Sequence, residues 1–282
     1  MAEEWKIKGK KFLITGGASG LGAAYAENFL KHGAGNVAIL DIAEEAGTEF
    51  VEKLNATYND KAIFVKCDVS NEEEIKASFD EVVNAFKRID VIVNNAGVMN
   101  DAPNVWRLAS DINWQGTASI TMKGLEHMRT DQGGSGGTII NISSGAALTK
   151  FSIVPIYSGS KAAVLQFGRS LAIPAFYAMT GIRVLTLVLG ATKTALIDDI
   201  KSKTFDEVIT APMLPYVQLA EQNIDSAVAA VTKMFEEGTP GSIWLSIYNR
   251  PGQDITPTID AAYGEIEKLL IPDGVESLYD QK

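Results

Sequence analysis

The organisation of the chain follows from one stretch near its N-terminus, Phe12-Leu13-Ile14-Thr15-Gly16-Gly17-Ala18-Ser19-Gly20-Leu21-Gly22. Its apolar start predicts a short strand, and its glycines predict a turn into a helix that ends near His32-Gly33. A second apolar run, Val37–Leu40, ends in Asp41. This order is typical of sites that bind a dinucleotide pyrophosphate on backbone N–H groups at a helix N-terminus. The spacing Gly16-x3-Gly20-x-Gly22 departs from the common G-x-G-x-x-G fingerprint, so a glycine turn without function is the alternative.

Apolar runs and helical patterns keep alternating as far as Leu189. This alternation predicts an α/β fold of the Rossmann type, a doubly wound parallel sheet with helices on both faces, as a single domain over 1–282. The predicted strands are 12–14, 37–40, 62–65, 90–93, 138–142 and 182–189, and the predicted helices include 44–54, 72–88 and 105–129.

Polar residues directly follow most of the predicted strands. Ligands of such sheets bind beyond the carboxyl ends of the strands, so we expect these polar residues to line one crevice. They are Thr15–Gly22, Asp41, Asp68, Asn94–Gly97, Ser143-Ser144 and Gly190–Thr194.

Composition argues against several classes of function. The chain has 282 residues, 46% of them hydrophobic, and a formal net charge of -10 at pH 7. That charge disfavours nucleic acid and anionic membrane surfaces as partners. With the single cysteine Cys67 and two distant histidines, we expect no internal disulfide and no metal. No apolar run is long enough to span a bilayer and no secretory h-region is visible, so we expect a cytoplasmic protein.

A tyrosine and a lysine lie one helical turn apart in Tyr157-Ser158-Gly159-Ser160-Lys161. Residues four apart share a helix face, so the phenol and the ammonium group can point into one space. A nearby cation favours the phenolate and lowers the pKa of a phenol from about 10. The pair would serve as a general base towards an alcohol or a general acid towards a carbonyl, although the same spacing also occurs on solvated helix faces.

Taken together and in order, these motifs resemble the short-chain dehydrogenase/reductase family, over about Gly9 to Asn249. Each motif alone is a weak signal, but the full series at the family's spacing is very specific. The residues that carry the resemblance are Thr15-Gly16-x3-Gly20-x-Gly22, Asp68, Asn94-Asn95-Ala96-Gly97, Asn113, Ser144 and Tyr157-x3-Lys161.

The resemblance implies an enzyme with four catalytic residues. Tyr157 would be the acid/base, and Lys161 would lower its pKa and bind the nicotinamide ribose. Ser144 would hydrogen-bond the substrate oxygen, and Asn113 would hold a water that links Lys161 to solvent. Ser143 is adjacent to Ser144, and the alternation of side chains along a strand turns one of the two away from the crevice.

The resemblance also implies a nicotinamide dinucleotide along the crevice. Asp41 would accept the ribose 2′ and 3′ hydroxyls and repel a 2′-phosphate, and no Arg or Lys lies within Gly16–Gly22, so we expect NAD rather than NADP. Where the family carries a proline, this chain has Leu189, which predicts a looser turn before Gly190. The residues implied in cofactor binding are Gly16, Ser19, Gly20, Leu21, Gly22, Asp41, Ile42, Asp68, Val69, Asn95, Ala96, Gly97, Tyr157, Lys161, Gly190, Thr192 and Thr194.

Two features resemble the subgroup of insect alcohol dehydrogenases and 15-hydroxyprostaglandin dehydrogenase. The last strand contains Gly241-Ser242-Ile243-Trp244-Leu245, where most relatives have an Asp-Gly-Gly turn, and Pro174 falls late in the helix after Lys161. We therefore expect oxidation of a lipophilic secondary alcohol, or reduction of its ketone. An apolar segment, 195–218, would form a lid over the substrate; the alternative is that its apolar residues belong to the core. The tail 256–282 has no assigned role.

Two other functions stay open. One is an NADPH-dependent carbonyl reductase, which Asp41 disfavours, and the other is a non-catalytic dinucleotide-sensing scaffold, which the complete catalytic set disfavours. The family is usually dimeric or tetrameric, so we expect a homodimer or homotetramer joined by the helix with Asn113 and the helix after Lys161. An apolar outer face of the second helix would come from Val164, Leu165, Phe167 and Leu171.

Overall fold

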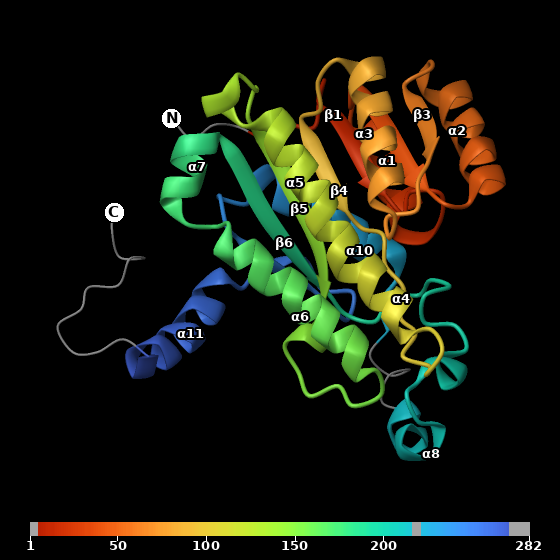
Figure 1. The fold of residues 1–282 in the computed structure, drawn as a ribbon, viewed down its shortest axis with the longest axis vertical. Coiled ribbons are helices and arrows are strands. Elements are labelled where there is room, and N and C mark those ends of the chain that lie inside the picture. Colours follow the sequence, from red (N-terminus) through yellow and green to blue (C-terminus); the bar gives the residue numbers. More distant parts are fainter. Residues whose placement is uncertain (1–4, 216–220, 271–282) are drawn as a thin grey trace.

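A computed structural model describes residues 5–215 and 221–270 of the chain. These residues form one eight-stranded sheet in the order β3-β2-β1-β4-β5-β6-β7-β8 (Figure 1). Every pair from β3 to β7 is parallel, and β8 runs antiparallel to β7. The predicted α/β fold is confirmed, with β8 as an unpredicted addition. The strands are β1 (Lys11–Thr15), β2 (Asn36–Asp41), β3 (Ala62–Lys66), β4 (Val91–Asn94), β5 (Gly137–Ser144), β6 (Ile182–Leu189), β7 (Ile243–Ser246) and β8 (Gln253–Asp254).

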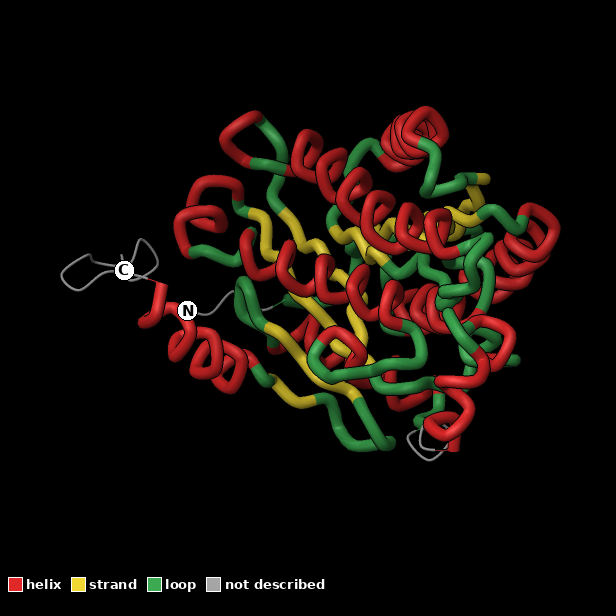
Figure 2. The backbone as a smooth tube through the Cα atoms, turned by 60° about the horizontal axis from the view of Figure 1, so that its bottom comes forward, coloured by secondary structure: helices red, strands yellow, loops and turns green. Residues whose placement is uncertain are grey.

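Helices cover both faces of this sheet, because successive strand residues point in opposite directions. Phe12 and Ile14 pack against α1 (Gly20–Lys31), α2 (Glu44–Tyr58) and α10 (Ile224–Glu237). Leu13 lies on the other face with α3 (Glu72–Phe86) and α5 (Thr117–Met128). Helix α6 (Pro155–Ser170) lies beside α5 on that second face, where Phe167 meets Trp114 edge-on. Figure 2 shows the strands in yellow between helices in red.

The predicted helix over 105–129 is interrupted. It consists of α4 (Trp106–Ser110), a π-helical segment (Asp111–Gly116) and α5. Short π-helical segments often mark functional sites, and this one contains Asn113.

Two expectations about α6 are wrong. Pro174 does not lie within the helix: α6 ends at Ser170, and Pro174 is the first residue of α7 (Pro174–Thr180). Proline has no N–H to continue a helix and favours extended backbone before it, as at Ile173. Val164 and Leu165 do not face outward either, since burial is almost complete at both, so they belong to the core.

Two predicted segments extend beyond the described residues. Residues 216–218 of the proposed lid and 271–282 of the proposed tail lie outside them. The described lid contains short helices at Ile200–Lys203, Glu207–Thr210 (α8) and Ala211–Met213, and the described tail forms α11 (Thr256–Leu270). Within 5–215 and 221–270, no helix combines the length and apolarity needed to cross a bilayer.

Candidate active site

The glycine turn leaves backbone N–H groups open at the start of α1. Gly16 and Gly20 have φ of 64° and 54°, a region that favours glycine. A Cβ on Gly22 would lie 2.1 Å from the Gly16 carbonyl oxygen, so only glycine allows the turn to pack on the helix. The N-cap residue Ser19 makes no side-chain capping bond. The first turn of α1 can therefore donate N–H groups to an anion.

The end of β4 holds this turn in place. Asn95 Nδ2 donates to the carbonyl oxygens of Thr15 (3.0 Å) and Gly16 (3.1 Å). The Thr15 hydroxyl accepts the N–H groups of Asn95 and Ala96, both at 3.1 Å. The side chain of Asn95 is thus committed to supporting the glycine turn, and the backbone around Ala96 lies against it.

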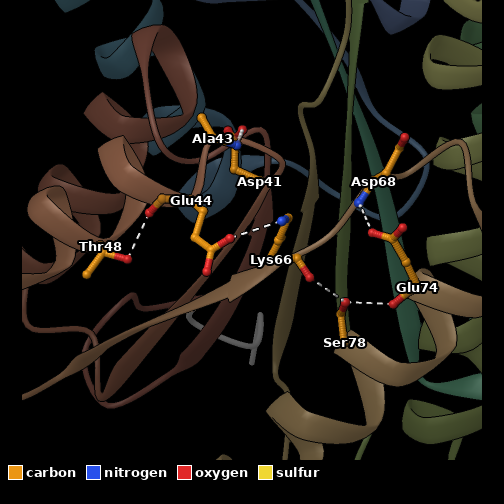
Figure 3. Close-up of polar contacts among 8 residues, drawn as sticks. All are labelled: Asp41, Ala43, Glu44, Thr48, Lys66, Asp68, Glu74 and Ser78. Atoms are coloured by element: carbon orange, nitrogen blue, oxygen red, sulfur yellow. Dashed lines mark hydrogen bonds and ion pairs between the residues drawn. The ribbon is translucent and has the colours of Figure 1, made fainter.

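Asp41 lies beside the turn at the end of β2 (Figure 3). One carboxylate oxygen accepts the Ala18 N–H and the other accepts the Ala43 N–H, each at 3.0 Å. The carboxylate oxygens retain lone pairs for further donors. The next side chain, Ile42, is apolar and 63% exposed.

Asp68 occupies the corresponding place after β3 (Figure 3). Its carboxylate accepts the Ser70 N–H at 2.8 Å, and its own N–H donates to Glu74 at 2.9 Å. Val69 is buried, with its carbonyl oxygen packed against Gly116. The structure thus places both predicted adenosine-side acids on the same edge of the sheet.

Ser144 and Tyr157 meet at the end of β5. The Ser144 side chain lies close enough to the Tyr157 phenol to lower its pKa, and the Ser144 hydroxyl accepts the Ala146 N–H at 3.2 Å. Ser143 points the other way: its hydroxyl donates to the Lys161 carbonyl oxygen at 2.8 Å and is buried. Alternation along β5 therefore selects Ser144 as the serine that faces Tyr157.

Burial dominates the ionisation of the tyrosine–lysine pair. It raises the pKa of Tyr157 to about 12, which the Ser144 hydrogen bond opposes, and it lowers the pKa of Lys161 to about 8. The Lys161 ammonium donates to the Ile142 carbonyl oxygen at 3.0 Å and lies 5.9 Å from the centroid of the Tyr157 ring. The pKa of Tyr157 is therefore raised rather than lowered in this structure, because desolvation of the phenolate outweighs the opposing effect of Ser144.

Asn113 is fully buried rather than on a helix surface. Its amide exchanges two 2.8 Å hydrogen bonds with the Val98 backbone and donates to the Ser160 hydroxyl at 3.1 Å. A Cβ on Gly97 would lie 3.1 Å from Asn113 Oδ1 and 3.2 Å from Lys161 Nζ. Asn113 and Lys161 therefore converge on Gly97 and tie the loop after β4 to α6.

The turn after β6 is held by hydrogen bonds instead of a proline. The Gly190 N–H donates to Ser246 at 2.8 Å, and the buried Thr192 hydroxyl donates to the Gly190 carbonyl oxygen at 3.0 Å. A Cβ on Gly20 would lie 3.8 Å from the Thr194 side chain. The turn thus closes towards the glycine turn at the start of α1.

Sequence reasoning missed Gln222, which fixes this turn. It is 1% exposed and donates to Thr192 Oγ1 (3.1 Å) and the Ser246 carbonyl oxygen (3.0 Å). Its backbone pairs with Ala191 and Lys193. No motif marks a lone glutamine, so only the fold could reveal it. These bonds hold the turn in which a looser backbone is predicted from Leu189.

Apolar side chains enclose Tyr157. The cluster around its ring combines residues of the lid with residues of two loops, and leaves the tyrosine 7% exposed. Its buried members besides Tyr157 are Met99, Ile153, Val154, Ile200 and Leu214. The tyrosine ring therefore belongs to an apolar cluster next to the reaction centre.

Comparisons with known proteins agree with this geometry. The family described as short chain dehydrogenase matches residues 10–204. The chain is 37% identical over 270 residues to 15-hydroxyprostaglandin dehydrogenase [NAD(+)] of Rattus norvegicus, covering 95% of this chain and 94% of that protein. It is 28% identical to alcohol dehydrogenase 2 of Ceratitis capitata, covering 90% and 96%. The chain belongs to the short-chain dehydrogenase family, and the predicted subgroup resemblance is confirmed.

Solved structures share the fold. A short-chain dehydrogenase/reductase from Burkholderia phymatum in complex with NAD superposes with a TM-score of 0.75 at 23% identity, covering 97% of this chain and 99% of that one. A short-chain type dehydrogenase/reductase from Mycobacterium marinum gives 0.72 at 24% identity, covering 86% and 95%. At these identities the likeness concerns the fold alone.

Proposed function

We propose that the protein is an NAD-dependent oxidoreductase that transfers hydride between a lipophilic secondary alcohol and NAD+. One observation carries the proposal. The side chains of Ser144 and Tyr157, with buried Lys161, lie on the same sheet edge as the open glycine turn and Asp41. A reaction centre and a dinucleotide site thus share one crevice.

The residues fit NAD. The uncapped N-terminus of α1 offers N–H groups to the pyrophosphate, and the glycines leave room for its close approach. Asp41 would accept the adenosine ribose hydroxyls and repel a 2′-phosphate, while Asp68 and Val69 would contact the adenine. The printed name of the rat relative specifies NAD(+), which supports the same choice. When bound, the nicotinamide ring supplies the hydride acceptor.

Tyr157 would transfer the substrate proton, and Ser144 would bind the reacting oxygen of the substrate. At neutral pH the Tyr157 phenol keeps its proton, because burial raises its pKa to about 12. In carbonyl reduction it can therefore donate that proton directly. In alcohol oxidation it must accept one as phenolate, which the nearby Lys161 cation favours. Ser144 would donate a hydrogen bond to the reacting oxygen and stabilise charge there.

The apolar cluster around Tyr157 supports a lipophilic substrate. Ile200 and Leu214 of the proposed lid belong to the same buried apolar cluster as Tyr157, so an alcohol that enters this cluster must offer apolar surface. The names of the relatives, a hydroxyprostaglandin dehydrogenase and alcohol dehydrogenases, fit this class. We propose that the segment over 195–218 acts as the substrate lid.

Assembly into a homo-oligomer is part of the proposal. Leu108 on α4 and Met122 on α5 are 50% and 55% exposed on the helical run that contains Asn113. Light scattering of the purified protein should therefore give the mass of a dimer or tetramer. A monomer at micromolar concentration would contradict this part.

The experiment is an absorbance assay at 340 nm with NAD+ and a panel of secondary alcohols of increasing chain length. We expect NADH formation that improves with chain length, slower turnover with NADP+, and a loss of about 10²–10⁴-fold in Tyr157→Phe. NADH should still bind to that variant. Turnover only with NADPH and carbonyls would favour a reductase, and no turnover in either direction would favour a sensing role.

A further inference from the structure

Asp101, which no sequence motif indicates, has a buried carboxylate beside the backbone of the proposed acid/base residue Tyr157. Asp101 belongs to the loop after β4 and is 1% exposed. Its two oxygens accept the backbone N–H groups of Ile156, at 2.6 Å, and of Tyr157, at 3.0 Å. The aspartate is 55 residues away from Ile156 in sequence, so the fold alone brings them together.

These two bonds satisfy the open N–H groups at the start of α6. The helix begins with Pro155, which has no N–H, and its N-cap residue Val154 makes no side-chain capping bond. The Ser158 N–H is already bonded to the Val154 carbonyl oxygen at 2.9 Å. Asp101 therefore caps the N-terminus of α6 from another segment of the chain. The helix dipole favours its negative charge at that position.

The same residue contacts the lid. The Asp101 N–H donates to the Lys203 carbonyl oxygen at 2.7 Å. The Lys203 ammonium in turn donates to the Ala195 and Leu196 carbonyl oxygens, both at 3.3 Å. Asp101 thus lies where the loop after β4, the lid and the catalytic helix meet. Within the described part of the chain its carboxylate has the two α6 N–H groups as hydrogen-bond donors.

The position of Tyr157 depends on this contact. Ser144 is fixed by its place in β5, paired with Leu189 in the sheet, whereas Tyr157 is in the first turn of a helix. First turns fray when their N–H groups lack partners. A shift of that turn would move the phenol relative to Ser144 without disturbing the glycine turn or Asp41.

We propose that Asp101 is a positioning residue: its carboxylate fixes the first turn of α6 and so holds the Tyr157 phenol opposite Ser144. The inference rests on the proposed function, since it assigns a role within that reaction. It predicts that loss of the carboxylate slows the chemical step more than it weakens cofactor binding.

The test compares Asp101→Ala and Asp101→Asn with Asn55→Ala. Asn55 makes a matched pair of side-chain bonds to the Ala62 backbone, at 2.8 and 3.0 Å, far from the crevice. Three quantities are measured: amide hydrogen exchange at Ile156 and Tyr157, NADH affinity by fluorescence, and kcat with its primary deuterium isotope effect for a carbinol-deuterated alcohol.

In Asp101→Ala we expect exchange in the first turn to accelerate at least about tenfold. We expect kcat to fall about tenfold to hundredfold with a larger isotope effect, while NADH affinity stays within about twofold. Asp101→Asn, which keeps one acceptor oxygen, should give an intermediate result and serves if the alanine variant does not fold. Asn55→Ala should leave kcat and the isotope effect unchanged.

Each of three results would overturn the inference in an active protein: unchanged exchange in the folded variants, an unchanged kcat and isotope effect despite faster exchange, or a fall in kcat with an unchanged isotope effect. The last of these would show a merely structural role. If the unmodified protein oxidises no alcohol, the proposed function fails by itself. The exchange measurement still shows whether Asp101 fixes the first turn of α6. Faster exchange in Asp101→Ala would then mean that Asp101 caps the helix without a role in catalysis, so the proposed positioning role would be rejected.

Discussion

The nucleotide half and the reaction half of the crevice are held in place differently. In the nucleotide half, the acids Asp41 and Asp68 are half-buried, and each accepts a backbone N–H from two residues further along the chain. In the reaction half, Asn113 and Asp101 are fully buried, and they bond to Ser160 and Ile156 across 47 and 55 residues. Substitutions in the first half should therefore change which cofactor is used, whereas those in the second should change rate or stability.

The largest effect we expect comes from two adjacent serines of the reaction half. Ser144→Ala removes the hydroxyl that lies beside Tyr157 and should lower kcat by about 10²–10³-fold. Ser143→Ala removes a buried bond to the Lys161 carbonyl oxygen and should cost about 1 kcal/mol of stability with most of kcat retained. Steady-state kinetics and urea unfolding separate the two effects. Equal losses of kcat would mean that the strand does not distinguish the two side chains.

A smaller effect should follow from the nucleotide half. Asp41→Ser removes the charge expected to face the ribose hydroxyls, so the ratio of kcat/KM for NAD+ over NADP+ should fall about tenfold to hundredfold. Glu44→Ser is the matched control. It removes the same charge three residues away, from an exposed ion pair with Lys66 (Figure 3). A similar loss of preference in both variants would assign the effect to general charge rather than to Asp41.

The smallest effect concerns stability and pH. Burial lowers the pKa of Lys161 from 10.5 to about 8, so below pH 8 the folded protein holds a buried ammonium at a cost of about 3 kcal/mol. Between those two values the folded state releases the proton first, and stability rises with pH. Lys161→Met should therefore be more stable than the unmodified protein by about 2 kcal/mol at pH 7, after the lost bond to Ile142 is subtracted.

Urea unfolding at pH 7 and pH 10 measures this difference. The advantage of Lys161→Met should shrink towards zero at the higher pH, because the lysine is then neutral in the folded state. Lys76→Met, at an exposed lysine of α3, should show no such dependence. If Lys161→Met is less stable than the unmodified protein at pH 7, then the buried ammonium does not lower the free energy of unfolding.

The sequence alone predicted the parts that depend on local pattern. The succession of strands and helices along the chain, the glycine turn and the acids after β2 and β3 follow from periodicity and turn chemistry. The orientation of Ser144 needed the register of β5, whereas the end of α6 before Pro174 agrees with the backbone preferences of proline, which the sequence prediction overlooked. Gln222 and Asp101 could not be found, because a lone polar residue becomes informative only when the fold shows what it touches.

The central claim is that Tyr157 and Ser144 hold the reacting oxygen beside a dinucleotide on the same sheet edge. A crystal structure with NAD+ and a ketone product or inert alcohol analogue tests it most directly. We expect the ligand oxygen within about 3.2 Å of both Tyr157 Oη and Ser144 Oγ, with the adenosine ribose on Asp41. A ligand oxygen remote from Tyr157, or a dinucleotide bound away from the glycine turn, would contradict the account.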